Sequence, residues 1–425
     1  MSHYGWIVVL SLVIAVLIAF TTPMGKYVGM AASNIIRGFG RTNINAMSDK
    51  NINDMQQKWQ DKIDELDNNM IKTNLKQNGK IPSNTTYEKA DGTTLSGNNG
   101  DSYPSSPSDG DVVVFENTYK YTYSADENGW SMITINKDLN VYPGIFTQIA
   151  NKDIVNLYEA FRDCINMIQS PAIPSTVKNL HSTFYGCSSL IDVTNLPDSV
   201  DEYGLILTFA KCESLTGVPK LPTGAKNLNS TFEGCSSLID VTNLPDSVDE
   251  CGLTNTFAYC KSLTCVPKLP TGAKYLIGTF KYCENMSQPP ILPEDTIQLD
   301  STFMYCTSLR YTPEFTKDIV SMPNAFDHCT SLETVNPLKF SHYENLRLTF
   351  YGCTSLRGNI EIDIVSGSSI YNYNGTFGGR TSSSPYITIT GSLSDTWKKA
   401  LANTGENVRY LDSSGILRDK NGNAV

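Results

Sequence analysis

Nine of the 11 cysteines recur at one position of a repeated phrase, Thr-Phe-x-x-Cys-x-Ser-Leu, and thiols in a row could form disulfides or bind a metal. They are Cys164, Cys187, Cys212, Cys235, Cys260, Cys283, Cys306, Cys329 and Cys353. If the repeats stack about 4.8 Å apart, the distance between neighbouring thiols allows a disulfide. Nine is nevertheless an odd number, each thiol has two equivalent neighbours, and Cys packs well as a small buried residue. We therefore expect buried free thiols.

Other sets of residues that carry chemistry are missing from the sequence. It has four His, and no Cys-x-x-Cys or His-x-x-x-His pair that would indicate a zinc site. No paired carboxylates, Ser–His–Asp set or glycine-rich phosphate loop stands at informative spacing. Cys251 and Cys265 lie outside the repeated position and are the better candidates for reactive thiols. The sequence predicts a protein that is not an enzyme and has no cofactor or metal.

Two rows of side chains are candidates for binding a partner. The first, the aromatic stripe, comes two residues after Phe in four successive repeats: Tyr259, Tyr282, Tyr305 and His328. Exposed rings in a row about 15 Å long suggest contact with a protein or glycan. The alternative is that the rings stack on one another and shield the surface. The second, the strand-face row, lies at outward-leaning positions of the predicted strands and consists of Asp192, Asp240, Gln288, Tyr311 and Thr334.

The element that must position these residues is a repeat of 23 to 25 residues. Phe recurs at this spacing from Phe161 to Phe350, with Leu or Met four residues before it and six residues after it. A period of this length predicts a solenoid, because one unit is too small to bury its own apolar face. Phe and Cys should share a face of one helical turn, and the Leu after them should begin a short strand. We expect nine coils over residues 151–360, with a parallel sheet on one side and short helical or irregular segments on the other.

The repeated phrase also resembles a known family. Gly-Cys-Ser-Ser-Leu-x-x-Val, followed by Leu-Pro and then Thr-Phe-x-Gly-Cys, is similar to the BspA-like, or Treponema-type, leucine-rich repeat over about residues 151–360. The resemblance implies a curved solenoid in bacterial surface or secreted proteins that act in adhesion or protein binding. The chain departs from the family by Thr before most Phe and by an extra residue in Val-Pro-Lys-Leu-Pro. Residues 182–229 and 230–277 match at 39 of 48 positions, which indicates a recent duplication of two coils.

The first 41 residues are predicted to form a membrane anchor and its juxtamembrane segment. Residues 4–23 are apolar enough, and just long enough, to cross a bilayer. A cleaved signal peptide is the alternative, although no Lys or Arg precedes the segment. Lys26, Arg37 and Arg41 favour a cytoplasmic location for the rest of the chain, whereas the repeats resemble an exported module. We expect a single-pass or signal-anchored protein of the cell membrane with an extracellular repeat domain.

Four further segments flank the repeats. Residues 42–76 are predicted to form an amphipathic helix, and 77–110, rich in Asn, Ser, Thr, Gly and Pro, a flexible linker. Residues 111–150 predict a β-hairpin that caps the first coil, because a bare solenoid end exposes an apolar layer. Residues 361–425 predict a degenerate tenth coil and a C-terminal cap, with a helix capped by Ser394 and a hairpin turn at Asn421-Gly422.

These features predict a membrane-anchored bacterial cell-surface protein that binds a protein or glycan on a host or neighbouring cell. The net charge of −10 argues against a nucleic-acid partner, because surfaces that bind nucleic acid are basic. The alternative is a structural spacer, or a subunit of a surface assembly, without a specific ligand.

Overall fold

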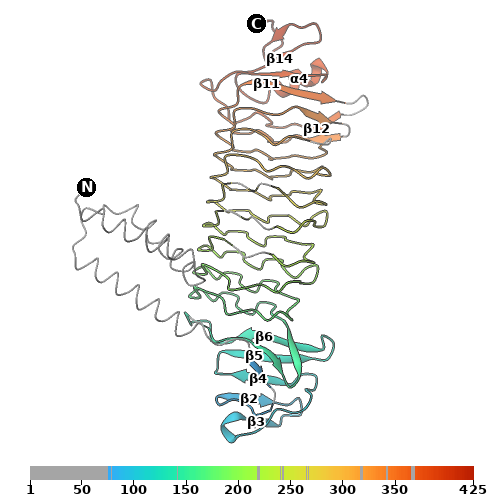
Figure 1. Ribbon diagram of the computed structural model, residues 1–425. Coiled ribbons are helices and arrows are strands. Elements are labelled where there is room, and N and C mark those ends of the chain that lie inside the picture. The colour runs from blue at the N-terminus through green and yellow to red at the C-terminus, as the bar shows by residue number, and fades with distance from the viewer. Residues whose placement is uncertain are drawn as a thin grey trace, which may run out of the picture. The chain divides into compact units, whose positions relative to one another are not determined.

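The computed structural model describes residues 75–77, 79–140, 142–217, 221–239, 241, 244–264, 266, 268–315, 319–340, 343–364 and 369–425. These residues form an N-terminal cap (75–156), a stack of coils (157–356) and a C-terminal cap (357–425), which follow one another in Figure 1.

The predicted membrane anchor (1–41), with its apolar segment 4–23, and nearly all of the predicted amphipathic helix (42–76) lie outside the described residues. Within the described part of the chain, no helix has the length and apolar character needed to cross a membrane. Its α-helix α4 (Asp395–Ala402) has eight residues and is therefore about 12 Å long, against a hydrocarbon core of ~30 Å. The prediction of a single-pass membrane protein with an extracellular repeat domain is corrected accordingly, and no anchor is assigned.

An eight-stranded sheet forms the N-terminal cap, in the order β1-β7-β8-β6-β5-β4-β2-β3. Its strands are β1 (Leu75–Gln77), β2 (Thr85–Glu88), β3 (Thr94–Ser96), β4 (Val112–Phe115), β5 (Tyr119–Ser124), β6 (Gly129–Thr134), β7 (Phe146–Ile149) and β8 (Lys152–Asn156). A short 3₁₀ helix, η2 (Gly97–Asn99), follows β3. The β1–β7 and β6–β8 pairs are parallel, and the other pairs are antiparallel.

The cap is larger than the sequence predicts. The segment 77–110, predicted as a flexible linker, supplies β2 and β3, because Tyr87 is fully buried and its hydroxyl donates a hydrogen bond to the buried Asp111. One large aromatic side chain therefore anchors a strand in a stretch that is otherwise polar. In place of a single hairpin over 111–150, the structure has β4, β5, β6 and β7. Glu116 and Asn117, at φ values of 48° and 50°, make a tight turn within a run that reads as one strand.

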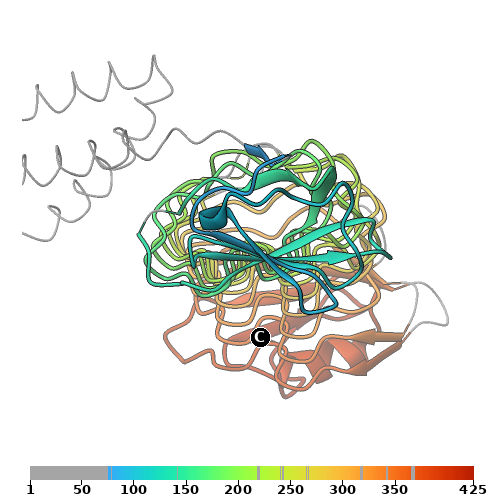
Figure 2. The same ribbon diagram turned by 90° about the horizontal axis from the view of Figure 1, so that it is seen from below.

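Successive coils lie over one another when viewed end-on (Figure 2). Each contains a tight turn around Phe, such as the turn in which the Cys260 N–H donates to the Phe257 carbonyl at 3.1 Å. The Phe257 N–H donates to the Thr279 carbonyl of the next coil at 2.9 Å, so the turns are bonded to one another. On the predicted strand side, described coils meet at isolated parallel bridges, such as that between Tyr311 and Thr334, and not in continuous strands. Proline follows this segment in most coils and has no N–H for a sheet ladder.

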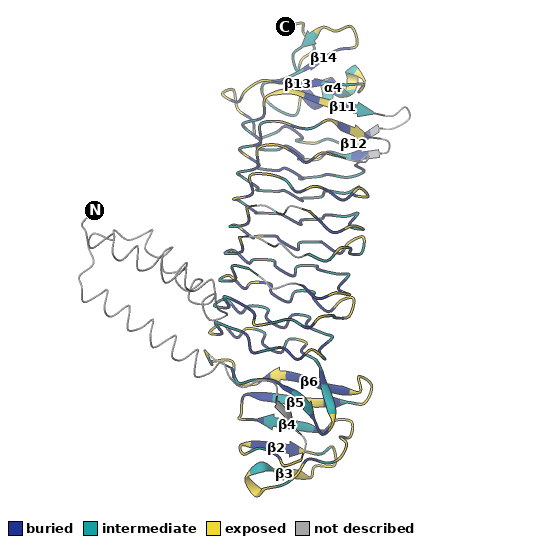
Figure 3. Cartoon of the chain, viewed as in Figure 1, coloured by how far each residue is buried: buried dark blue, intermediate teal, exposed yellow. Residues whose placement is uncertain are grey.

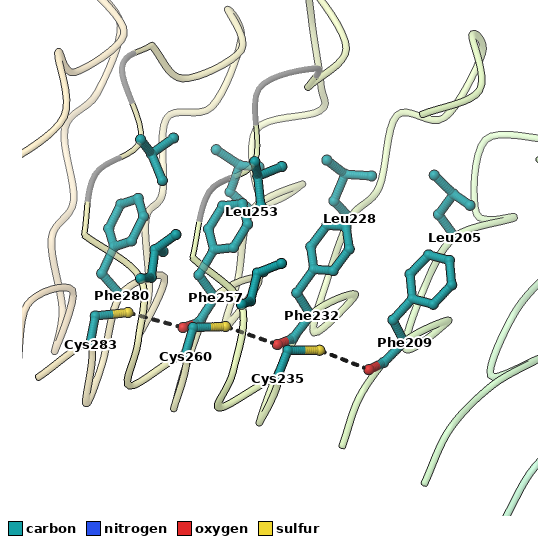
Figure 4. Packing of buried hydrophobic residues seen from close by; sticks show 14 of the residues in the cluster. Leu205, Phe209, Leu228, Phe232, Cys235, Leu253, Phe257, Cys260, Phe280 and Cys283 are labelled. Atoms are coloured by element: carbon teal, nitrogen blue, oxygen red, sulfur yellow. Dashed lines mark hydrogen bonds between the residues drawn. The ribbon is translucent and has the colours of Figure 1, made fainter. Parts of the chain in front are cut away.

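A stack of phenylalanine rings forms the centre of the coils (Figure 4). Buried segments recur from coil to coil along the chain (Figure 3). Ten rings, from Phe161 to Phe377, lie with centroids 5.3–5.7 Å apart and planes within 11° of each other. Tyr119 and Tyr142 of the N-terminal cap cover the first ring edge-on. The Leu and Met positions on both sides of Phe are buried as well. The prediction that Phe, Cys and Leu are scaffold residues is confirmed.

Two ladders of hydrogen bonds accompany the ring stack. In one, the Thr before Phe donates to the carbonyl of a Leu or Met in the preceding coil, as from Thr256 Oγ1 to Leu228 O at 2.9 Å. This bond accounts for the Thr that departs from the family pattern. In the other, which we call the thiol ladder, Cys260 Sγ donates to the Phe232 carbonyl at 3.1 Å, and Figure 4 shows the same bond in neighbouring coils. All nine repeat cysteines are buried and free, as predicted, and burial raises their pKa.

The C-terminal cap contains the last coil, and regular β-strands form both in the cap and in the coil before it. The strands near this end are β9 (Leu338–Phe340), β10 (Tyr343–Asn345), β11 (Gly358–Ile364), β12 (Ser369–Asn372), β13 (Ile387–Thr390), β14 (Val408–Leu411) and β15 (Leu417–Arg418). They form a five-stranded sheet, β15-β14-β13-β11-β9, and a pair, β10-β12. Ser394 caps α4, as predicted. The β14–β15 hairpin turns at residues 412–416, and Asn421-Gly422 lies in a later turn that is closed by the bond from Gly422 N to Asp419 O.

Arg380 occupies the position of the repeat cysteine in the tenth coil. It is buried, and its guanidinium donates to the carbonyls of Cys353 (2.7 Å), Leu356 (3.1 Å) and Glu406 (3.2 Å). The thiol ladder therefore ends on a side chain with several donors, which satisfies backbone carbonyls that a thiol could not all reach.

Candidate functional site

The aromatic stripe lies on backbone that normally favours glycine. Tyr259, Tyr282, Tyr305 and His328 have φ values of 63°, 61°, 61° and 58°. The same position is glycine in three other coils (Gly186, Gly234 and Gly352) and Asp163 or Lys211 in two more, all at positive φ. A left-handed conformation costs an L-residue roughly 1–2 kcal/mol that glycine does not lose. The stripe therefore keeps large rings at a position where glycine is the less strained residue.

The rings of the aromatic stripe stack on one another. The centroid distances are 4.7 Å for Tyr259–Tyr282, 4.5 Å for Tyr282–Tyr305 and 4.5 Å for Tyr305–His328, with planes within 9°. Contacts of this kind contribute roughly 0.5–1.5 kcal/mol each, which offsets much of the backbone strain. The stacking that the sequence offered as the alternative is therefore present, and the side chains stay partly exposed. Contact of these rings with a partner stays a prediction.

A buried carboxylate holds the last ring of the stripe. Asp327 is buried, and its Oδ1 lies 2.5 Å from His328 Nδ1. Desolvation raises the pKa of Asp327, and the hydrogen bond to His328 acts in the opposite direction. The His328 ring leans over Gly352, where an added Cβ would lie 3.1 Å from His328 Cδ2. The stripe therefore ends against a glycine at its C-terminal side.

The strand-face row is less uniform than the sequence predicts. Asp192 is buried and its Oδ1 accepts a hydrogen bond from the Val193 N–H, so the prediction that it leans outward is wrong. Asp240 lies outside the described residues. Gln288, Tyr311 and Thr334 are exposed. Among the described contacts, no hydrogen bond, ion pair or ring contact joins these three to the aromatic stripe.

Two further surface groups were not anticipated from the sequence. On the N-terminal side of the stripe, the Arg162 guanidinium lies 4.4 Å and the Lys211 ammonium 5.2 Å from the centre of the Tyr185 ring. A signal was present, because Tyr185 and Lys211 are among the nine positions at which the two duplicated blocks differ. Beside Tyr311, Glu333 binds arginines of both neighbouring coils, Arg310 at 2.9 Å and Arg357. Arg310 also holds the pKa of Glu333 below its usual value.

The described residues contain no group of three or more His, Cys, Asp or Glu side chains placed to hold a metal ion. A hollow of about 490 Å³ lies in the N-terminal cap and is lined by polar residues, among them Asn84, Asn98, Glu116 and Asn117. Neither region places a nucleophilic side chain beside a general base. What the surface offers is a set of side chains repeated from coil to coil.

Solved structures with the same repeat were compared with this chain. A T. pallidum leucine rich repeat protein is 29% identical, with a TM-score of 0.39, over 45% of this chain and 88% of that chain. A leucine-rich repeat protein from Bacteroides ovatus is 19% identical, with a TM-score of 0.35, over 71% and 91%. A leucine rich cell surface protein from Faecalibacterium prausnitzii is 18% identical, with a TM-score of 0.28, over 59% and 94%. No curated protein matches the chain.

The family comparison covers the coils and much of the C-terminal cap. The BspA type leucine rich repeat region matches as six copies, within residues 157–287, 207–310 and 273–408. These ranges take in the ring stack, the thiol ladder and the aromatic stripe, and together they span more than half of the chain. The protein therefore belongs to the BspA type leucine rich repeat family.

Proposed function

We propose that the protein binds a protein or a glycan, and that the aromatic stripe is the centre of its binding surface. The observation that carries this proposal is the backbone conformation of Tyr259, Tyr282, Tyr305 and His328. All four keep rings at positive φ, where other coils have glycine (Gly186, Gly234, Gly352), Asp163 or Lys211. Strain that is kept at a partly exposed surface is a reason to look for function there.

The chemistry of the stripe supports a binding role. Tyr has a large apolar ring and a hydroxyl at its edge, which is why it is enriched where proteins contact partners. Because the stripe contributes one ring per coil, its polar groups recur at the coil spacing of about 4.8 Å. An extended ligand can then be contacted one coil at a time, as is general for solenoids. Gln288, Tyr311 and Thr334 offer a second surface, which stays a prediction.

The test uses the full chain and a variant that deletes the rings with little damage to the fold. Tyr259, Tyr282 and Tyr305 are replaced together by Gly, the residue that the same position carries in other coils. Wild type and variant are applied to glycan arrays and protein arrays. We expect the wild type to bind at least one ligand, and the variant to lose that ligand while its circular dichroism spectrum is unchanged.

Tyr203→Ser is the matched control, because Tyr203 is exposed and the duplicated block has Cys251 in its place. It should leave binding unchanged. Binding that survives the triple replacement would move the site away from the stripe. A wild-type chain that binds nothing and forms multimers would favour the structural spacer and overturn the proposal.

A further inference from the structure

A row of side chains runs from Tyr185 through Lys211 to the aromatic stripe, and between Lys211 and Tyr259 it is interrupted at Gly234. On one side, Lys211 lies near the Tyr185 ring, at 5.2 Å from its centre. On the other side, Tyr259 begins the aromatic stripe. Between them the corresponding residue has no side chain. The surface thus has a gap one coil wide between a cationic side chain and an aromatic ring.

The gap has room for one ring. Lys211 and Tyr259 are two coils apart, which at about 4.8 Å per coil separates their backbones by roughly 10 Å. The three atoms nearest to a Cβ placed on Gly234 all belong to Lys211, at 3.6 Å, an ordinary contact distance. A ring seated against Tyr259 at about 3.5–4 Å would therefore continue the stack without displacing the backbone.

One face of Tyr259 is available for such a ring. Among the ring contacts in the described part of the chain, Tyr259 has one, with Tyr282 on its C-terminal side. Tyr282 and Tyr305 each have a ring on both faces. Tyr259 is also 38% exposed, whereas Tyr282 and Tyr305 are less so. The unpaired face is an apolar platform at the edge of the gap.

The polar groups beside the platform have opposite charges. Lys211 carries an ammonium, and Glu233, next to Gly234 in the chain, carries a carboxylate. The two residues are tied together by the bond from Lys211 N to Glu233 O at 2.6 Å. For a ligand with a net charge, attraction by one of these groups is offset by repulsion from the other, so net charge gives no advantage here. A ring with an apolar C–H face and neutral hydroxyls at its edge can use the platform, the donor and the acceptor together.

We propose that the position above Gly234 is a subsite for one neutral pyranose ring, stacked on Tyr259 with its hydroxyls toward Lys211 and Glu233. This assignment rests on the proposed binding function and narrows it to a glycan. The ligand continues the row that runs from Tyr185 to His328. Aromatic side chains of a peptide have a similar shape but lack the ring hydroxyls, so they serve as the contrasting probe.

The experiment fills the gap above Gly234 with a tyrosine side chain. In Gly234→Tyr, a tyrosine takes the conformation that Tyr259 already has, and occupies the space of the sugar. Tyr259→Gly removes the platform instead, and Tyr203→Ser is the control. Binding of methyl β-glucopyranoside, methyl β-galactopyranoside and methyl α-mannopyranoside to full-length protein is measured by saturation-transfer NMR, and binding of neutral oligosaccharides by calorimetry. Tyrosine amide and glucuronic acid are the contrasting probes.

We expect saturation of protons on one face of a neutral pyranose, and a loss of affinity of about tenfold or more in both Gly234→Tyr and Tyr259→Gly. The control should bind as the wild type does. Sugar binding that both variants retain would overturn the subsite and leave the proposed function standing. Preference for tyrosine amide or glucuronic acid would also overturn it. A chain that binds no sugar but binds a protein on the array would overturn the subsite alone, whereas a chain that binds nothing overturns both.

Discussion

The N-terminal cap and the coils both bury aromatic rings, but they arrange them differently. In the cap, Trp130 meets Tyr87 and Tyr123 edge-on, at interplanar angles of 76° and 61°. In the coils, each Phe ring lies parallel to the next within 11°. Each ring of the cap has surroundings of its own, set by an eight-stranded sheet. A coil ring has the same surroundings as its neighbours, so stability there is a sum of similar nearest-neighbour contacts.

Alkaline pH should separate the two regions most strongly, because the repeat thiols lie in the coils and none lies in the cap. Burial raises the pKa of thiols such as those of Cys235, Cys260 and Cys283. Below about pH 8.5 folded and unfolded states both keep these protons, and stability does not depend on them. Above it the unfolded state releases them, so the free energy of unfolding falls by about 1.4 kcal/mol per pH unit for each thiol. With nine thiols, the loss is on the order of 10 kcal/mol by about pH 9.5.

The cap should respond later. Its groups with raised pKa include Tyr119 and Tyr121, whose burial disfavours the phenolate, and unfolded Tyr titrates near pH 10. Guanidinium unfolding between about pH 7 and pH 10, followed by hydrogen exchange of peptides from each region, checks the order. Cys235→Ala should reduce the number of protons released by one. Coils and cap that lose stability at the same pH would contradict the assignment to thiols.

Removing one ring from each region should give effects of similar size but different form. Phe257→Ala and Trp130→Ala each delete a fully buried side chain and should lower the free energy of unfolding by about 3–5 kcal/mol. In the coils, the cavity left by Phe257→Ala weakens the coupling between the coils on its two sides, so unfolding should divide into two steps. In the cap, exchange should rise in residues 75–156 while the central coils stay protected. A single cooperative transition in both variants would show that the coils do not behave as nearest-neighbour units.

The polar atoms of the two regions offer a smaller contrast. Thr256 Oγ1 donates to Leu228 O, whereas Thr134 Oγ1 in the cap is buried and has no hydrogen-bond partner among the described residues. Thr256→Val should cost about 0.5–1.5 kcal/mol, because the Leu228 carbonyl loses the second of its two hydrogen bonds and keeps the one from the Thr231 N–H. Thr134→Val should be neutral or stabilising, because it removes a hydroxyl that was already unpaired. Urea unfolding of both variants checks the difference, and equal losses would contradict it.

The same contrast explains how far the sequence could be interpreted. In the coils, Phe, Cys and Leu each have one fixed role, and repetition makes that role visible, so the solenoid and its buried residues were predicted correctly. The cap has no repetition. Its strand β2 depends on Tyr87 and Asp111, which lie 24 residues apart and carry no local signal. Residue type also failed to show that Asp192 turns back to its own backbone, because carboxylates are normally exposed.

The positive φ of the aromatic stripe residues could have been predicted from the sequence but was not. Tyr at one position says nothing about φ, because most Tyr residues avoid the left-handed region. Glycine at the same position of three other coils does carry that information, since glycine is the usual residue for positive φ. Comparing coils by position would therefore have shown the strain, and with it the gap at Gly234. What such a comparison could not show is that the rings stack, because stacking depends on side-chain rotamers.

Tyr282→Gly is also expected to have a small effect, and it tests whether the stripe is needed for stability. The change removes two ring contacts, worth roughly 0.5–1.5 kcal/mol each, and relieves about 1–2 kcal/mol of left-handed strain. Glycine also adds about 0.5–1 kcal/mol of chain entropy to be lost on folding. These terms leave a net loss of about 1 kcal/mol, so the melting temperature should fall by a few degrees at most.

A loss in Tyr282→Gly as large as that in Phe257→Ala would make the stripe a second core ladder, held for stability alone. A near-zero change would mean that the fold does not need the ring. Coils of this chain that carry glycine at the same position already form without one. Four successive coils would then keep strained rings that contribute almost nothing to folding. Because the inner Phe rings already account for the stacking of the coils, that result would support the proposed contact of the stripe with a partner outside the chain.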